Sequence, residues 1–109
     1  MKFKIGQKIE VTEDFYMEEA LSDKKILVKK GDKGFVDSRG HIHYTSGNAI
    51  GKIHLLKGLE VKEYDTENIA EMIFNRLKRV FDIDEFLNGY DISKDDFINE
   101  IDDVLMDIL

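Results

Sequence analysis

The sequence predicts an α+β protein in which a small antiparallel β-barrel packs against two or three C-terminal α-helices. Three observations support this fold class: six of the eight glycines precede Lys57, short β-branched runs lie between them, and from Asp65 the apolar residues repeat with a helical period. The 109 residues suffice for one compact domain. We therefore expect a barrel over residues 1–64 and an acidic helical segment over residues 65–109 that shares its core.

In the N-terminal half, the apolar residues alternate between glycine-punctuated turns, as in a half-buried antiparallel sheet. The run Asp37–Gly40 is a hairpin signal, and Lys57-Gly58 is a second one. Because several short strands in about 60 residues avoid exposed edges only by closing on themselves, we expect the sheet to curl into a barrel. The expected strands are Lys8–Glu13, Lys25–Lys30, Lys33–Ser38, His41–Thr45, Lys52–Leu56 and Leu59–Glu63.

Two glycine steps in this half resemble the opening of SH3-like barrels, including the KOW-type modules of ribosomal and transcription proteins. They are KIGQKIEV over residues 4–11 and VKKGDKGFV over residues 28–36. In those families a glycine-led turn feeds the first strand, and a Gly-x-x-Gly-x-Val step bends the chain across the barrel. The resemblance implies an SH3-like architecture and implies little about function. The matching positions are Gly6, Gly31, Gly34 and Val36, and the chain departs from KOW modules by inserting a long loop over Thr12–Lys25.

The helical half begins at a capping residue, either Asp65 or Thr66, with an acidic residue in the first turn. Apolar residues then follow the spacing of one buried helix face up to Phe81. A short helical turn is expected over Asp84–Asn88, ended by Gly89 in the left-handed conformation.

The last helix carries the strongest local signals. Ser93 is placed to cap it, with Asp96 in the reciprocal position of a capping box and Ile92 placed to pack against Phe97. Its apolar side is expected to be buried and its acidic side to face water. The residues expected on the buried side are Phe97, Ile98, Ile101, Val104, Leu105 and Ile108.

Negative charge is concentrated in these helices. Residues 65–109 hold thirteen acidic and four basic residues, whereas residues 1–64 hold ten acidic and twelve basic ones, giving the chain a net charge of −7. Such a field attracts basic protein surfaces and repels nucleic acid. A solvated face that only keeps the protein soluble is the alternative. The residues predicted to bind a partner are Asp95, Asn99, Asp102, Asp103 and Asp107.

The stretches FDIDEFL over residues 81–87 and YDISKDDF over residues 90–97 resemble segments of small uncharacterised proteins carried by phages and mobile elements of Gram-positive bacteria. This resemblance implies an accessory protein that acts by binding, and inhibitors of host defence belong to that class. We therefore predict a non-enzymatic interaction module that binds a basic surface of a host protein, as an inhibitor or a nucleic-acid mimic.

Two other binding chemistries are open to this sequence. A lysine-rich barrel that binds nucleic acid is the alternative function, because cations beside aromatic rings neutralise phosphates and stack on bases. His41 and His43 share one strand face, and with His54 on a neighbouring strand they would suit zinc, although histidines on a surface hairpin are the commoner arrangement. The carboxylates from Asp82 onward do not follow the calcium-loop spacing, so we expect no metal and no cofactor. The residues of the nucleic-acid alternative are Lys29, Lys30, Lys33, Arg39 and Lys52.

Several other classes of protein are disfavoured. The chain has no cysteine, no nucleophile motif and no phosphate-binding loop, so we do not expect an enzyme. It also shows neither a secretory signal nor an apolar window long enough to cross a bilayer, and we expect a soluble, cytoplasmic protein without membrane contact. Apolar residues such as Phe74, Phe86 and Leu109 leave the choice between monomer and homodimer open.

Overall fold

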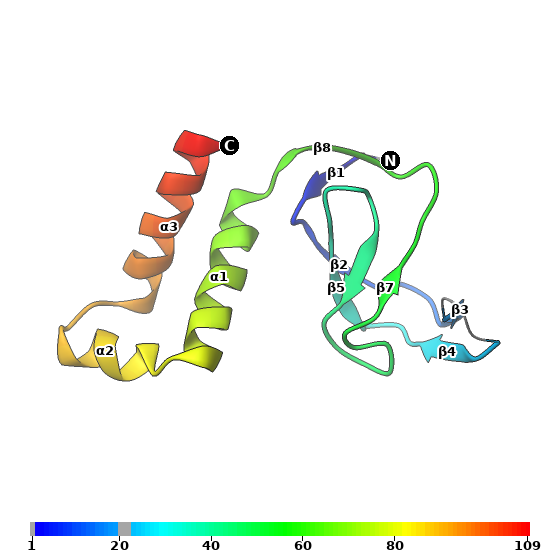
Figure 1. Cartoon of the computed structure of the whole chain (residues 1–109), viewed down its shortest axis with the longest axis horizontal. Coiled ribbons are helices and arrows are strands. Elements are labelled where there is room, and N and C mark those ends of the chain that lie inside the picture. The colour runs from blue at the N-terminus through cyan, green and yellow to red at the C-terminus, as the bar shows by residue number, and fades with distance from the viewer. Residues whose placement is uncertain (1, 20–22) are drawn as a thin grey trace. The chain divides into compact units, whose positions relative to one another are not determined.

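The computed structural model describes residues 2–19 and 23–109 (Figure 1). The chain forms two compact units, which we call the strand unit, ending at Glu63, and the helical unit, Tyr64–Leu109. The predicted α+β class is confirmed, with antiparallel sheets in the first half and helices in the second. Closure of the strands into a barrel, and a core shared with the helices, stay predictions.

The strands form three small sheets. The largest has the order β2-β5-β6-β7, while β1 pairs with β8 and β3 with β4. Every pair within the largest sheet is antiparallel. The described strands are β1 Lys2–Ile5, β2 Lys8–Glu10, β3 Phe15–Glu18, β4 Lys25–Val28, β5 Lys33–Val36, β6 Ile42–Tyr44, β7 Ile53–His54 and β8 Glu60–Tyr64.

Gly34 allows the central strands to approach closely. It pairs with Ile9 of β2 on one side and with Tyr44 of β6 on the other. A Cβ atom added at Gly34 would lie 2.5 Å from the backbone oxygen of His43, closer than real Cβ contacts. The position therefore requires glycine for space, whereas Gly31, in the preceding turn, has a φ of 93° that favours glycine by conformation.

The expected loop over Thr12–Lys25 contains a strand. β3 runs through Phe15–Glu18 and pairs with β4, so the prediction of a loop is wrong there; residues 20–22 of that loop lie outside the described residues. Burial of the side chains alternates along this segment, as in a strand, since Tyr16 is 67% exposed and Met17 only 3%. Met17 thereby joins the core of the strand unit with Val11, Val28, Tyr44 and Ala49.

The first two strands also differ from the prediction. β1, Lys2–Ile5, is absent from the predicted strands, and it pairs with β8. The strand predicted to reach Glu13 ends at Glu10. The next residue, Val11, donates its backbone N–H to the carbonyl of Asp32, in the turn before β5.

The helical unit consists of α1 Thr66–Val80, α2 Ile83–Gly89 and α3 Lys94–Ile108. Both predicted caps are present. A side-chain oxygen of Asp65 accepts the N–H of Asn68 at 3.0 Å, and Ser93 Oγ accepts the N–H of Asp96 at 3.0 Å. Among the described residues, no helix is long and apolar enough to cross a bilayer.

The end of α2 differs from the expectation. Gly89 is the last residue of the helix rather than a left-handed residue after it. The left-handed position falls on Asp91, with a φ of 55°. Aspartate tolerates the left-handed conformation better than most residues, so the chain adopts it at Asp91 without a glycine.

The helical unit buries few side chains completely. Within the described residues they are Ala70, Phe74 and Leu87, so the expectation that Phe74 is available for dimerisation is wrong. The Phe74 and Phe97 rings pack in a T-shaped arrangement at a centroid distance of 5.9 Å.

α3 is less buried than expected. Phe97, Ile98, Ile101 and Leu105 are half-buried, but Val104 and Ile108 are 54% and 73% exposed. The contacts of α3 within this unit are made mainly with α1, so one neighbour covers only part of the apolar side of α3.

Candidate interaction surfaces

Most acidic side chains of α3 lie on one exposed face of the helix. The predicted residues Asp95, Asn99, Asp103 and Asp107 are all exposed. Asp96 and Glu100 are exposed as well, and helical spacing places them on the same side. We call this set the acidic face: Asp95, Asp96, Asn99, Glu100, Asp103 and Asp107.

Sequence reasoning missed Asp96 and Glu100, although their spacing was visible. Together with Asp103 and Asp107 they are separated by four, three and four residues in turn, and this spacing aligns side chains along one side of a helix. Asp96 takes part in the cap of α3 only through its backbone N–H, which donates to Ser93 Oγ, and its side chain is exposed.

Asp102 does not belong to this face. It is half-buried, and its Oδ1 is shielded from water without a hydrogen-bond partner among the described residues. The helical period explains the difference, since Asp102 lies one turn from Ile98 and next to half-buried Ile101, on the side that α1 covers. The expectation that Asp102 is displayed to a partner is therefore wrong.

Within the described residues, no acidic side chain of α3 forms an ion pair. Among the described residues, ion pairs join His43 to Asp37, Lys52 to Glu19 and Lys78 to Asp84. Two of these belong to the strand unit, and the third links α1 to α2. The carboxylates of the acidic face therefore have no ion-pair partner among the described residues.

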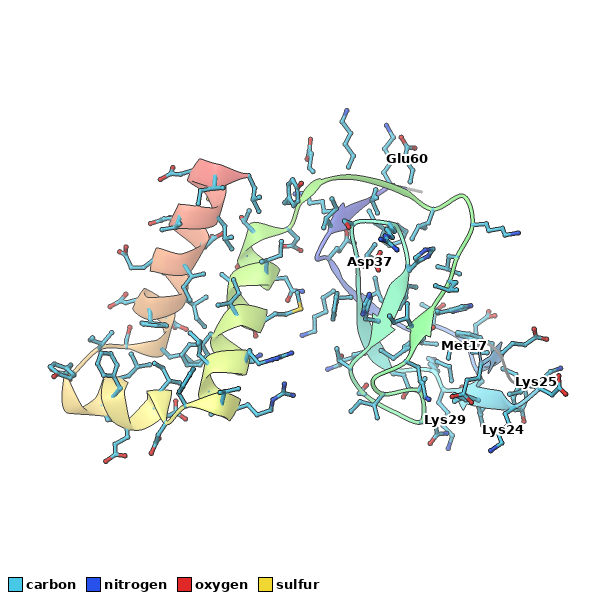
Figure 2. The ribbon with its side chains drawn as sticks, viewed as in Figure 1. Met17, Lys24, Lys25, Lys29, Asp37 and Glu60 are labelled. Carbon is cyan, nitrogen blue, oxygen red and sulfur yellow. The ribbon has the colours of Figure 1, made fainter. Side chains whose placement is uncertain are left out.

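The residues of the nucleic-acid alternative are dispersed. Lys29 and Lys30 lie in the turn after β4, and Lys33 opens β5. Arg39 lies in the turn at the opposite end of the β5–β6 hairpin. The four residues of β5 separate this turn from Lys33 by roughly 13 Å. Figure 2 shows Lys24, Lys25 and Lys29 near β4, while Asp37, at the Arg39 end, is remote from them.

Lys52 is occupied by an internal partner. Its Nζ lies 2.5 Å from Glu19 Oε1, and the hydrogen bond and positive charge of Lys52 hold the pKa of Glu19 below its usual range. A lysine already paired with a carboxylate contributes less to phosphate binding. The five basic residues thus do not form one continuous surface.

The histidines do not converge either. In the β6–β7 register, His43 lies opposite Ile53 and His54 opposite Ile42, so the two rings point to opposite faces of the sheet. His41 Nδ1 accepts the N–H of Leu56 at 3.1 Å. In the part of the chain that the structure describes, no three His, Cys, Asp or Glu side chains are arranged to hold a metal ion.

Asp37 organises the β5–β6 turn. Its Oδ1 accepts the N–H groups of Arg39 and His41 at 2.9 Å each, and its Oδ2 lies 2.8 Å from His43 Nε2. Partial burial raises the pKa of Asp37, but the hydrogen bonds from His41, His43 and Arg39 outweigh this, so the net pKa is below its usual range. His43 also stacks on Phe35 at 4.8 Å.

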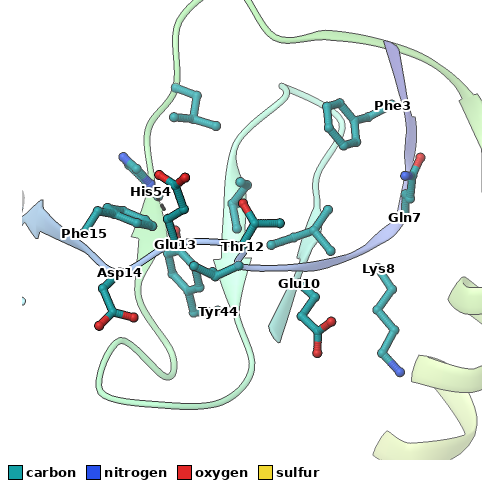
Figure 3. A pocket seen from close by; sticks show the side chains of 14 residues that line it. Phe3, Gln7, Lys8, Glu10, Thr12, Glu13, Asp14, Phe15, Tyr44 and His54 are labelled. Atoms are coloured by element: carbon teal, nitrogen blue, oxygen red, sulfur yellow. Dashed lines mark hydrogen bonds between the residues drawn. The ribbon is translucent and has the colours of Figure 1, made fainter. Parts of the chain in front are cut away.

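The strand unit contains an open groove of about 580 Å³. Figure 3 shows Phe15, Tyr44 and His54 at one end of it and Phe3 and Gln7 at the other. The hydroxyl of Tyr44 lies 3.1 Å from His54 Nδ1, and the His54 ring stacks on Phe15 at 5.6 Å. None of this arrangement was predicted, because it brings together residues from β3, β6 and β7.

Burial shifts both members of the Tyr44–His54 pair toward their neutral forms. Burial, followed by the negative charge of Asp32, raises the pKa of the Tyr44 hydroxyl. Burial lowers the pKa of His54. The hydrogen bond therefore joins a neutral hydroxyl to a neutral imidazole, and the tautomer of His54 determines which of the two donates.

Comparison of the chain with protein-family models, with curated proteins and with solved structures finds no match.

Proposed function

We propose that this protein is an interaction module that binds a basic surface of another protein through the acidic face of α3. One observation carries the proposal: the face is exposed, and its carboxylates have no basic partner among the described residues. Unpaired charge on an ordered helix steers a partner of opposite charge and fixes its orientation.

The spacing of the carboxylates supports a nucleic-acid mimic. Asp96, Glu100, Asp103 and Asp107 follow one another at three or four residues, which corresponds to about 4.5–6 Å along the helix axis. A strand of duplex DNA carries a phosphate about every 3.4 Å of its axis. Both present negative charge at intervals of several Å, so a protein surface shaped for phosphates is the favoured partner.

Exposed apolar residues beside the charges can supply affinity. Val104 and Ile108 follow Glu100 at successive four-residue steps, along one ridge of α3, and both are more than half exposed. Charges at an interface mainly determine orientation and association rate, whereas buried apolar contacts slow dissociation. We further propose that the partner is a host protein, as the resemblance of residues 81–87 and 90–97 to phage and mobile-element proteins would imply.

The proposal is tested by reversing charge in the second half of α3. Glu100→Lys, Asp103→Lys and Asp107→Lys avoid the first turn, where acidic residues favour the helix, and the C-terminal lysines complement the helix dipole. The triple variant should remain folded by circular dichroism. Affinity purification from a lysate of the source cells, followed by mass spectrometry, should show loss of a basic protein that the unmodified chain retains.

A matched variant separates the position of the charges from their number. Glu18→Lys, Asp23→Lys and Glu60→Lys change the net charge equally at exposed sites of the strand unit, and this variant should retain the partner. Equal retention by the α3 variant would contradict the proposal. Recovery of nucleic acid instead of a basic protein would favour the lysine-rich alternative.

A further inference from the structure

The groove of the strand unit runs along the edge of a strand. Its lining includes nine consecutive residues, Gln7–Phe15, which cover β2 and the segment after it. Side chains of a strand alternate between two faces, so an unbroken run indicates that the strand edge itself lines the groove. The facing wall comes from β6, β7 and the segment after β7, through Ile42, Tyr44, His54 and Leu56.

The edge of β2 offers unpaired backbone groups. β2 is the first strand of its sheet and pairs only with β5, where Ile9 lies opposite Gly34 and the Val11 N–H donates to the Asp32 carbonyl. Backbone groups alternate between the two sides of an antiparallel strand, so those of Lys8, Glu10 and Thr12 point away from β5. No hydrogen bond from or to these outward groups occurs within the described residues.

The groove combines an apolar floor with an acidic rim. Half-buried Ile9, Phe15 and Ile42 expose apolar surface beside the core. Around them the exposed rim carries the carboxylates of Glu10, Glu13 and Asp14 against the single lysine Lys8. In Figure 3 Lys8 and Glu10 extend to the same side of β2. The excess of negative charge favours a ligand that is both basic and partly apolar.

We propose that this groove binds an extended peptide segment with alternating basic and apolar residues, which adds a strand to the free edge of β2. The backbone of the segment pairs with Lys8, Glu10 and Thr12, its apolar side chains cover the groove floor, and its basic side chains meet the rim carboxylates. At the end near Phe15, the His54 ring lines the groove beside the bound segment. This site is separate from the acidic face of α3 and does not depend on it.

The test uses the full chain with α3 neutralised by Glu100→Gln, Asp103→Asn and Asp107→Asn, so that binding there does not interfere. The probe is a blocked octapeptide of alternating lysine and valine, followed by amide NMR spectra. We expect shifts confined to residues 8–14 and around His54, with slower hydrogen exchange at Lys8, Glu10 and Thr12. A second probe, N-methylated at alternate backbone amides, should bind at least tenfold more weakly, because it cannot donate to the strand edge.

Rim variants measure the charge contribution. Glu10→Lys with Glu13→Lys should weaken binding of the lysine–valine peptide about tenfold, while Glu18→Lys with Glu60→Lys, outside the groove, should change it less than twofold. A glutamate–valine octapeptide should not bind. Absence of binding by the lysine–valine peptide, shifts that map elsewhere, or equal binding of the N-methylated or acidic peptide would each overturn the proposal. None of these outcomes bears on the acidic face of α3.

Discussion

Replacement of Asp37 by alanine should destabilise the strand unit by about 2–4 kcal/mol. The carboxylate accepts two backbone N–H groups, from Arg39 and His41, and contacts His43 Nε2, all at 2.8–2.9 Å. Each hydrogen bond contributes about 0.5–1.5 kcal/mol, and more when one partner is charged, which gives this total for three bonds. The side chain is only 23% exposed, so water restores these bonds incompletely.

Urea unfolding at neutral pH, followed by circular dichroism, measures this cost. Asp37→Asn keeps an oxygen for the two backbone donors and should lose about 1 kcal/mol, less than Asp37→Ala. His43→Phe retains an aromatic ring to stack on Phe35 and isolates the side-chain bond. A loss below about 0.5 kcal/mol for Asp37→Ala, or equal losses for alanine and asparagine, would refute this reasoning.

The same carboxylate makes stability depend on pH. Partial burial raises the pKa of Asp37 and the hydrogen bonds lower it by more, so its folded pKa is below the unfolded value of about 3.9. A depressed carboxylate pKa contributes stability that is present above the unfolded pKa and is lost as pH falls through the folded one. The stability difference between the unmodified chain and Asp37→Asn should therefore narrow from about pH 5 downward.

Three further predictions concern two buried residues, Phe74 and Gly34, and the half-buried His54. Phe74→Ala removes a ring with no exposed surface that packs on Phe97, and it should cost about 3–5 kcal/mol, seen as loss of amide protection in α1 and α3. Gly34→Ala places a methyl group 2.5 Å from the His43 carbonyl oxygen and should cost about 1–3 kcal/mol in urea unfolding. Burial lowers the pKa of His54, so stability should decrease as pH falls below about 6.5 through the folded pKa, and His54→Phe should flatten that part of the profile.

The helical unit was the more predictable half, because its determinants are local. The caps at Asp65 and Ser93 each involve residues three apart, and both bonds are formed in the structure. Charge and period together indicated four residues of the acidic face, but Asp96 and Glu100 were missed. Asp102 was wrongly included, because its burial depends on where α1 packs. Periodicity gives the faces of a helix, but the width of the covered face depends on tertiary contacts, as Val104 and Ile108 show.

The strand unit was predicted less completely, because pairing partners are distant in sequence. β3 alternates inward Phe15 and Met17 with outward Tyr16, but its acidic flanks and the absence of a clear turn signal suggested a loop. The groove depends on the register that turns His54 toward Tyr44 and on which edge of β2 stays free. Neither property is encoded in a short motif.

We propose that α3 binds a basic protein surface through its acidic face, and a salt-dependent binding measurement tests this. The most direct measurement is the dissociation constant of the captured partner for the unmodified chain, the α3 triple-lysine variant and the strand-unit control, at about 50 and 300 mM salt. We expect the partner's affinity for the unmodified chain and for the control to fall steeply with salt, while the α3 variant binds weakly at both concentrations. An α3 variant that binds as tightly as the unmodified chain at low salt would contradict the proposal.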